Sequence, residues 1–415
     1  MKLIPLNENN RKWIFNLCFL LTIVSVAFTF FNTKDSRVSF FIASYAAAIG
    51  IFSGRIKPGK DEWLFLIALL TLGFSKVIWF AIQYIGSPDF DIYNSYLASG
   101  KRLMIAAAIG YFLLGSQHII SVNHEKIIRY SLSVAFIIAT CVGMYQIMIH
   151  VDRVDFFQGR ATDASYMYAA LATALIFVLL RDASSPRYLI GAFMVFVFAL
   201  ALILFTGTRN TFASFPLAII FVALLKFRHF GIKGFSIGLV TLLIIIASSY
   251  HAVIKPRVDA TVQEYELFEK SQGNDMGSLT TRLAMWKVGM QSFIAHPLGL
   301  SQEHRLAWFH QYVDTNNRDK SALIYANVHL HDEVMDTASL QGIFGLAALL
   351  FYYVVTASVA WTQRNAAMLS VFLIVLITGL TDVVFISRDQ TIFFPVLMIV
   401  TMLWQKSRNL RLSMK

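Results

Sequence analysis

Several basic side chains stand in the short segments between apolar runs, where they could bind an anion. Arg209 occupies the turn 206–211, and the others share its setting: Lys101, Arg102, Arg153, Arg160 and Arg388. A single arginine there is usually an interfacial anchor whose aliphatic stem lies in the apolar layer. Several on one membrane face instead indicate an anion site, because a guanidinium stays charged and donates two parallel hydrogen bonds to phosphate.

His331 is the residue best suited to act as a general base beside these arginines. The acids that follow it suit the start of a helix, where the partial positive charge favours them: Asp332, Glu333 and Asp336. Gly342 follows His331 after about three helical turns, so we expect both on one helix face. Gly345 would extend a stripe of small residues that permits close helix packing. The alternative is a structural histidine at a membrane interface.

Two other patterns could bind a phosphate or a metal, but each has a simpler explanation. Residues 54–60, GRIKPGK, have the spacing of a phosphate-binding loop, yet Asp61 replaces the Ser or Thr that binds Mg²⁺ and no predicted strand precedes them. We interpret this segment as a basic turn. Asp89 and Asp91 form the DxD pair with which many glycosyltransferases hold a divalent cation. Two acids in a short loop are also common by chance, and we prefer that interpretation.

His329 and His331 could ligate zinc together with the carboxylates that follow them. A catalytic zinc needs a third protein ligand, and no residue at a typical spacing supplies one unambiguously. We therefore predict no metal site, with zinc ligation by these histidines as the alternative. Cys18 and Cys141 both lie in apolar runs, so neither a disulfide scaffold nor a structural zinc site is expected.

Membrane-spanning helices are the elements that must position these residues. Apolar residues make up 57% of the 415-residue chain and charged residues only 14%, against about 25% in soluble domains. This composition excludes most soluble enzymes and disordered chains, and it predicts an all-α polytopic membrane protein. We expect about 12 transmembrane helices, near residues 13–31, 38–53, 63–85, 103–121, 128–149, 165–180, 188–205, 211–225, 235–253, 335–359, 366–385 and 391–404.

The distribution of charge predicts how these helices are oriented. The net charge of +11 is concentrated in one set of segments: the N-terminus, 54–62, 122–129, 181–187, 226–234, 361–365 and the C-terminal tail. By the positive-inside bias these segments face the cytoplasm, so the charge does not imply nucleic-acid binding. Residues 254–332 then form a large, partly helical periplasmic loop. It separates transmembrane helices 1–9 (residues 1–253) from helices 10–12 and a basic cytoplasmic tail (residues 333–415).

The order of these motifs resembles the bacterial O-antigen ligase family, whose superfamily also holds O-antigen polymerases and O-oligosaccharyltransferases. The sharpest element is His331-Asp332, followed after nine residues by Gly342-Ile-Phe-Gly345. The family usually has Asn, Ser or Gln after the histidine, so Asp332 departs from the pattern. The turn around Arg209 resembles the family's catalytic arginine element.

Further similarities lie in three other segments. Residues 281–286, with Arg282, continue to His296-Pro-Leu-Gly299 and resemble the loop whose arginine faces the donor pyrophosphate. Gly159-Arg160 and the stretch 379–388, which contains Asp382 and Arg388, also resemble family segments, with less specificity.

The resemblance implies a glycosyltransferase C fold and an active site that faces the periplasm at the bacterial inner membrane. Such an enzyme transfers O-antigen polysaccharide from undecaprenyl pyrophosphate to a sugar hydroxyl of lipid A-core in lipopolysaccharide biosynthesis. The transfer would invert the anomeric centre without metal or cofactor, and the partners would be these two lipids and the membrane. His331 would be the base, Arg209 and Arg282 would stabilise the leaving group, and weaker pyrophosphate-binding candidates are Arg160, Lys101 and Arg102. Supporting residues would be Asp332, Gly342, Gly345, Asp382 and Arg388.

Three alternatives remain open. An O-antigen polymerase usually has a less defined His-GxxG element, and an O-oligosaccharyltransferase would need a protein acceptor. A transporter of lipid-linked glycans would use the same arginines to hold an anionic headgroup. It should show charged or broken helices at mid-membrane, whereas Lys76 is the one basic residue well inside a predicted span.

Overall fold

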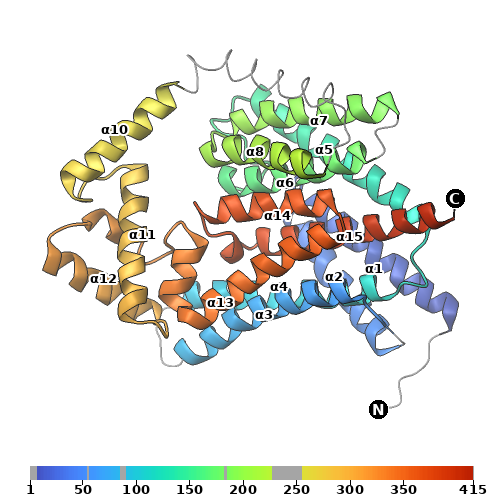
Figure 1. Cartoon of the computed structure of the whole chain (residues 1–415), viewed down its shortest axis with the longest axis horizontal. Helices are drawn as coiled ribbons and strands as arrows, with labels where there is room; N and C mark the ends of the chain where they lie inside the picture. Colours follow the sequence, from blue (N-terminus) through green and yellow to red (C-terminus); the bar gives the residue numbers. More distant parts are fainter. Residues whose placement is uncertain (1–6, 54–55, 85–89, 182–184, 227–254, 415) are drawn as a thin grey trace.

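The computed structural model describes residues 7–53, 56–84, 90–181, 185–226 and 255–414, and all regular elements among them are helices (Figure 1). The first group comprises α1 Glu8–Phe28, α2 Thr33–Phe52, α3 Lys60–Gln83, α4 Phe90–Gly115, α5 Val122–Met148, α6 Ala161–Leu180, α7 Pro186–Phe205 and α8 Arg209–Lys226. The second comprises α10 Lys255–Ser271, α11 Ser278–Ala295, α12 Gln302–Asn316 and the short η2 Lys320–Ile324. The third comprises α13 Glu333–Thr362, α14 Ala366–Gly379, the short η3 Val384–Ile386 and α15 Gln390–Ser413. The all-α prediction is confirmed for these ranges.

Seven of the described helices are long and apolar enough to cross a membrane: α1, α3, α4, α5, α6, α7 and α13. α8 and α14 are also apolar but have shorter apolar stretches than these seven helices. Each predicted span overlaps at least one helix, apart from 235–253, which lies outside the described residues. These findings support a polytopic membrane protein, while the count of about 12 spans stays a prediction.

Two helix boundaries differ from the expected ones in ways that matter for function. α4 begins at Phe90, well before residue 103, and its early residues Tyr93 and Tyr96 are fully buried against protein. α14 ends at Gly379, before residue 385, and an irregular segment with η3 leads to α15. An apolar run indicates which residues leave water, but it does not distinguish lipid neighbours from protein neighbours. The irregular segment is the one that carries Asp382.

α6 is the central helix of the bundle. Within an apolar stretch of 18 residues in this helix, 89% of the residues are buried, and the helix packs against α5, α7, α8, α14 and α15. Small residues allow these helices to approach closely, among them the buried Ala169, Ala170, Ala172 and Ala174. Arg160 is the N-cap residue of this helix. Side chains at the start of α6 are therefore held by the most buried of the seven candidate spans.

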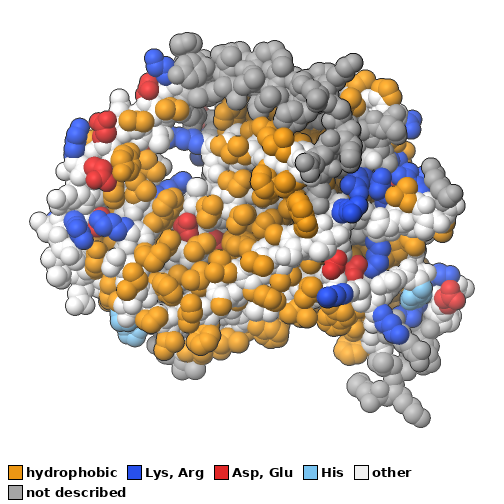
Figure 2. Space-filling model, viewed as in Figure 1, with side chains coloured by type: hydrophobic (Ala, Val, Ile, Leu, Met, Phe, Trp, Pro, Cys, Tyr) orange, Lys and Arg blue, Asp and Glu red, His pale blue; other side chains and the backbone are white. Residues whose placement is uncertain are grey.

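α10, α11, α12 and η2 form a separate layer beside the bundle (Figure 1). This outer layer has its own small core, which includes Met285, Val288, Phe309, Ala322 and Leu330. α11 carries Arg282 and ends before His296-Pro297. In the view of Figure 2 the bundle surface is largely hydrophobic, whereas charged side chains of both signs lie over the outer layer. This contrast fits a lipid-facing bundle with a water-facing outer layer.

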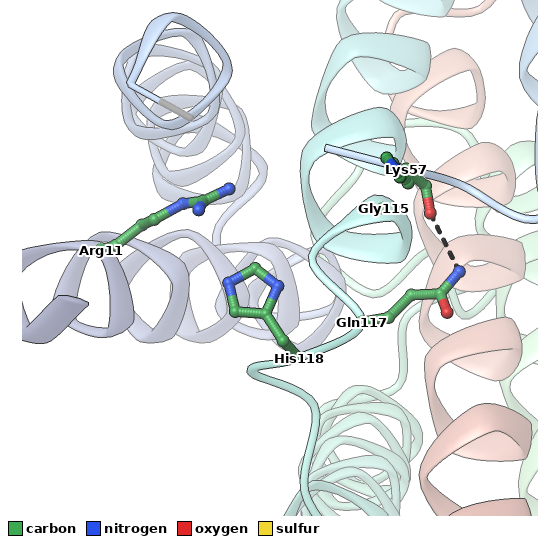
Figure 3. Close-up of a pocket in the computed structure, with 5 residues that line it drawn as sticks. All are labelled: Arg11, Lys57, Gly115, Gln117 and His118. Carbon is green, nitrogen blue, oxygen red and sulfur yellow. Dashed lines mark hydrogen bonds between the residues drawn. The ribbon is translucent and has the colours of Figure 1, made fainter. Parts of the chain in front are cut away.

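The segments predicted to be cytoplasmic meet at one end of the bundle. The Lys406 ammonium lies 3.0 Å from Glu62, and the Arg411 guanidinium lies 2.9 Å from Glu125. A cavity of about 460 Å³ opens at this end, lined by Arg11, Lys57, Gly115, Gln117 and His118 (Figure 3). The described basic segments therefore share one face of the molecule, as expected from their charge, whereas 227–234 lie outside the described residues; the assignment of that face to the cytoplasm stays a prediction.

Candidate active site

A cavity of about 560 Å³ lies at the other end of the bundle, next to the outer layer. The loop that enters it from α5 contacts the far end of α1, because the Gln158 amide donates to the Thr29 carbonyl at 3.1 Å. Three segments line the cavity: 151–163 around the start of α6, residues 329 and 331 before α13, and residues 382–387 after α14. It contains five residues singled out in the sequence, namely Arg153, Arg160, His329, His331 and Asp382. We therefore regard this cavity, called the cleft below, as the candidate active site.

His331 and Asp382 form the central pair of the cleft. The His331 Nδ1 atom lies 3.3 Å from Asp382 Oδ1, and Asp382 also accepts from the Val383 backbone N–H at 2.9 Å. The Tyr166 hydroxyl donates to the second carboxylate oxygen at 3.4 Å. Because a carboxylate only accepts, the imidazole proton sits on Nδ1 and the lone pair on Nε2. A histidine oriented in this way by a carboxylate can act as a general base through Nε2.

The backbone around His331 differs from the expected helix. α13 begins only at Glu333, with Asp332 as its N-cap: the Asp332 carboxylate accepts from the Met335 N–H at 2.7 Å. His331 itself has a φ of 50°, a left-handed conformation that is uncommon outside glycine. The Trp286 indole N–H donates to its carbonyl at 3.3 Å. The expectation that His331 and Gly342 share one helix face is therefore wrong, because His331 precedes the helix.

Gly342 is a point of backbone contact instead of part of a helix-packing stripe. Its φ of 63° and ψ of −157° interrupt α13 with a kink. A β-carbon at Gly342 would lie 2.6 Å from the Pro297 carbonyl oxygen, and the Ile343 N–H donates to that same oxygen at 2.8 Å. Gly299, with a φ of 89°, faces Gly342 from the other side. The two motifs His296–Gly299 and Gly342–Gly345 thus dock on each other, and Gly345 packs against the Gln341 side chain.

Two buried carboxylates in the first turn of α13 hold the two loops that carry the central pair. Asp336 accepts from the Leu330 backbone N–H at 3.2 Å, one residue before His331. Glu333 accepts from the Phe385 backbone N–H at 2.8 Å, three residues after Asp382. The start of α13 therefore fixes the position of His331 relative to Asp382.

Each of these carboxylates has a buried cation as its partner. The Arg305 guanidinium of α12 lies 2.8 Å from Asp336, and the Lys76 ammonium of α3 lies 3.6 Å from Glu333. All four side chains are at most 1% exposed. Removing one member of a buried ion pair costs about 3–5 kcal/mol, because the other charge is left unpaired. Lys76, the basic residue expected inside a span, therefore has a structural partner.

Arg160 reaches the cleft from a loop shaped by Asp155. This carboxylate accepts from the backbone N–H groups of Phe157 at 2.9 Å and Gly159 at 3.0 Å. Gly159 has a φ of 75°, and Arg160 then caps α6 with its side chain exposed. An exposed guanidinium on a well-fixed loop is free to bind an anion that enters the cleft.

Arg209 and Arg282 lie near the cleft without lining it. Arg209 begins α8, and its guanidinium is 3.9 Å from Glu264 of α10. The same carboxylate accepts from the Leu279 N–H at 2.6 Å in the first turn of α11, the helix that carries Arg282. Arg282 also interacts electrostatically with Tyr166, the partner of Asp382. Glu264 thus connects Arg209 to the first turn of the helix that carries Arg282.

Lys101, Arg102 and Arg388 are not part of the cleft. Lys101 is exposed on α4. Arg102 interacts electrostatically with Arg37, Arg388 and Asp389, which form a second group of charges. The structure therefore separates the basic residues singled out in the sequence into two sets, one in and around the cleft and one beside it.

Asp382 supplies a possible third metal ligand that sequence spacing did not reveal. Ligand atoms of His329, His331 and Asp382 all lie within 4.8 Å of one another. The His331 backbone N–H donates to His329 Nδ1 at 3.3 Å, and His331 Nδ1 faces Asp382. Burial and the neighbouring His331 lower the pKa of His329, which keeps its ring neutral. The contact with Asp382 orients His331 for acid–base chemistry through Nε2, and zinc ligation by the three residues stays the alternative.

Asp332 offers a test of the departure from the family pattern. Burial raises the pKa of Asp332 to about 6, so its ionisation opposes folding and its contribution to stability is lost as the pH rises from about 4 to 6. Asparagine caps a helix as well as aspartate does. We expect D332N to retain the glycan transfer that the family resemblance implies. The variant should melt at a higher temperature than the wild type at pH 8, and the difference in melting temperature should be smaller at pH 4. A lower melting temperature at pH 8 would contradict this account.

Several side chains in the site were missed or given no role from the sequence. Arg153 lines the cleft and donates to the Thr206 carbonyl at 2.8 Å, which braces the turn before Arg209. Asn210 donates to the Thr381 hydroxyl next to Asp382. Tyr166 stands in an apolar span, where a tyrosine is ordinary, so no local signal marks it. Arg153 was visible as a basic residue between spans.

Comparisons with known proteins find similarity over nearly the whole chain. A family model described as O-antigen ligase matches residues 194–350, a range that includes Arg209, Arg282 and His331. An O-antigen ligase from Escherichia coli (strain K12) is 28% identical over 402 residues, which are 95% of this chain and 93% of that protein. The family model contains the sharpest motifs and the similarity extends over nearly the whole of both proteins, so the comparisons support the resemblance of this chain to the O-antigen ligase family.

Proposed function

We propose that this protein is an O-antigen ligase that joins a glycan from undecaprenyl pyrophosphate to a sugar hydroxyl of lipid A-core. The observation that carries the proposal is the pairing of His331 with Asp382 in a cleft that also contains Arg160. Arg209 and Arg282 lie beside the same cleft. A base and several guanidinium groups are the two requirements for transfer from a pyrophosphate to a hydroxyl.

In the proposed reaction, His331 Nε2 takes the proton of the acceptor hydroxyl as its oxygen attacks the anomeric carbon. Asp382 accepts from Nδ1–H throughout and stabilises the imidazolium that forms, at a distance of 3.3 Å. The bond between the anomeric carbon and the pyrophosphate oxygen breaks in the same step. A single displacement of this kind inverts the anomeric centre.

The arginines act on the leaving group in this proposal. The departing pyrophosphate oxygen gains negative charge in the transition state, and fixed cations nearby lower the energy of that state. Arg160 lines the cleft, Arg209 contacts Glu264 beside it, and Arg282 interacts electrostatically with Tyr166, the partner of Asp382. The apolar helices around the cleft would give both lipid substrates access from the bilayer.

The test is a transfer assay with purified protein, polymer-loaded undecaprenyl pyrophosphate and lipid A-core, followed by gel mobility. We expect a lipid A-core product of higher mass that forms equally well with and without EDTA. Glycan chains that lengthen on the carrier without lipid A-core would instead identify a polymerase. A product found only with a protein acceptor would identify an oligosaccharyltransferase, and transport without a covalent product would identify a transporter. Loss of transfer in EDTA would point to a metal at His329, His331 and Asp382.

Arg209 should not tolerate replacement by lysine. An ammonium cannot reproduce the bidentate contact of a guanidinium with phosphate, and loss of one charge-stabilising group typically costs about 10²- to 10³-fold in rate. We expect R209K to lower transfer in the same assay by roughly a hundredfold while membrane insertion persists. K270R on exposed α10 is a matched control that changes the same two residue types away from the cleft. Full activity in R209K would remove Arg209 from the proposed site.

A further inference from the structure

A second group of charges lies beside the cleft and is not used by the proposed reaction. It consists of Arg37 on α2, Arg102 on α4, and Arg388 and Asp389 before α15, and we call it the Arg102 cluster. Arg37 donates to both oxygens of Asp389, at 2.7 Å and 3.2 Å. Arg102 interacts electrostatically with all three of the other residues. The cluster thus combines three guanidinium groups with one carboxylate.

Part of the Arg102 guanidinium is buried without a hydrogen-bond acceptor among the described residues. Its Nε and Nη1 atoms are buried, and neither has a hydrogen-bond partner within the described part of the chain. The Asp389 carboxylate is engaged in its two-pronged contact with Arg37. A buried charged donor without an acceptor is costly, so such groups are normally satisfied by a partner. An anion that binds between these arginines would supply the missing acceptors and balance the excess charge.

The position of the cluster indicates an anion carried by a lipid. Ser387, directly before Arg388, lines the cleft and donates to Asp163 at 2.9 Å. On α2, the residues that follow Arg37 include large exposed apolar side chains, Val38 at 47% and Phe41 at 37%. The cluster therefore lies between the cleft and an apolar helix surface suited to lipid. A ligand that fits both features has an anionic headgroup and apolar chains.

We propose that the Arg102 cluster binds a phosphate ester on a membrane lipid, separately from the carrier pyrophosphate. Guanidinium groups fit phosphate oxygens with parallel hydrogen bonds. Two lipids could supply the phosphate: the phosphorylated acceptor glycolipid or a phospholipid of the surrounding bilayer. The first source rests on the proposed function, whereas a lipid phosphate at this site does not. Bound acceptor would be held next to the cleft in which its hydroxyl reacts.

Native mass spectrometry of the purified full-length protein tests the proposal with three lipids added separately. These are diphosphoryl lipid A, the same lipid after removal of both phosphates, and phosphatidylglycerol. We expect diphosphoryl lipid A to bind at least about tenfold more tightly than the dephosphorylated form, as charge-assisted hydrogen bonds would predict. Equal or tighter binding of phosphatidylglycerol would identify the bilayer phospholipid as the source.

Two variants and one control assign the binding to the cluster. R102Q removes the partly buried guanidinium, and R388Q removes an exposed one whose loss should not affect folding. Both should weaken binding of the phosphorylated lipid by about tenfold. K34Q, which neutralises an exposed residue one turn before Arg37 on α2, should leave it within about twofold. Wild-type affinity in both R102Q and R388Q, or equal binding of the dephosphorylated lipid, would overturn the proposal. No carrier-linked glycan is present, so failure here is distinct from failure of ligation.

Discussion

Replacing His331 with alanine is expected to abolish glycan transfer while the protein still inserts into the membrane. The change removes the only group in the proposed reaction that takes the acceptor proton, and a general base typically contributes roughly 10²- to 10⁴-fold in rate. Folding should persist because Asp382 keeps its contacts with Tyr166 and the Val383 N–H. Gel mobility of lipid A-core measures transfer, and immunoblotting of membranes measures the amount of protein.

His310 offers a matched control, because it is an exposed histidine on α12, away from the cleft. H310A should transfer glycan at the wild-type rate. D382N should lie between H331A and the wild type, since an amide can present a donor to Nδ1 and favour the wrong tautomer. Ligation by H331A at more than a tenth of the wild-type rate would contradict the assignment of His331 as the base.

The sequence predicted the helices of the bundle because long apolar runs have few alternatives in a membrane. It also placed His331, Arg160 and Asp382 among the functional residues, and these three meet in the cleft. The motifs were informative about these three residues, because each residue lies in a short segment that resembles the family. The apolar runs were less informative about helix ends. α4 extends beyond its predicted start because Tyr93 and Tyr96 pack against protein, which hydropathy does not distinguish from lipid.

Pairings between distant segments could not be predicted from local patterns. His331 and Asp382 are separated by the whole of α13 and α14, and no local pattern in either segment indicates that the two residues meet. The same holds for Lys76 with Glu333 and for Arg305 with Asp336. Arg102 resembled the other basic residues between spans, yet it belongs to a different cluster. Spacing along a chain specifies contacts within one helix, whereas contacts between helices depend on how the bundle packs.

The buried ion pairs of α13 connect packing of the bundle to the chemistry of the cleft. Lys76 reaches Glu333 from α3, and Arg305 reaches Asp336 from the outer layer. The two carboxylates then hold the loops of Asp382 and His331, respectively. Both the bundle and the outer layer therefore help to fix the hydrogen bond between His331 and Asp382. A base and its orienting carboxylate need such support, because small displacements lower the rate steeply.

Replacing Gly342 with alanine is expected to destabilise the protein and to lower transfer with it. Its φ of 63° and ψ of −157° lie in a region that is essentially restricted to glycine, which alone costs about 1–3 kcal/mol for another residue. The added β-carbon would also meet backbone atoms of Pro297, Leu298 and Gly299, which have little freedom to move. The docking of the outer layer on α13 should loosen, so we expect a lower melting temperature in detergent and less product.

Gly191 on α7, outside the cleft lining, provides the control for this prediction. Among the described residues, a β-carbon there would meet only the Leu179 side chain, at an ordinary contact distance of 3.6 Å. G191A should therefore melt closer to the wild type than G342A and retain more transfer activity. Equal melting temperatures for the two variants would mean that the contact of Gly342 with Gly299 does not hold the outer layer on α13. The larger effect at Gly342 would instead show that the pair Gly299 and Gly342 fixes a backbone junction, from which the loop of His331 is positioned.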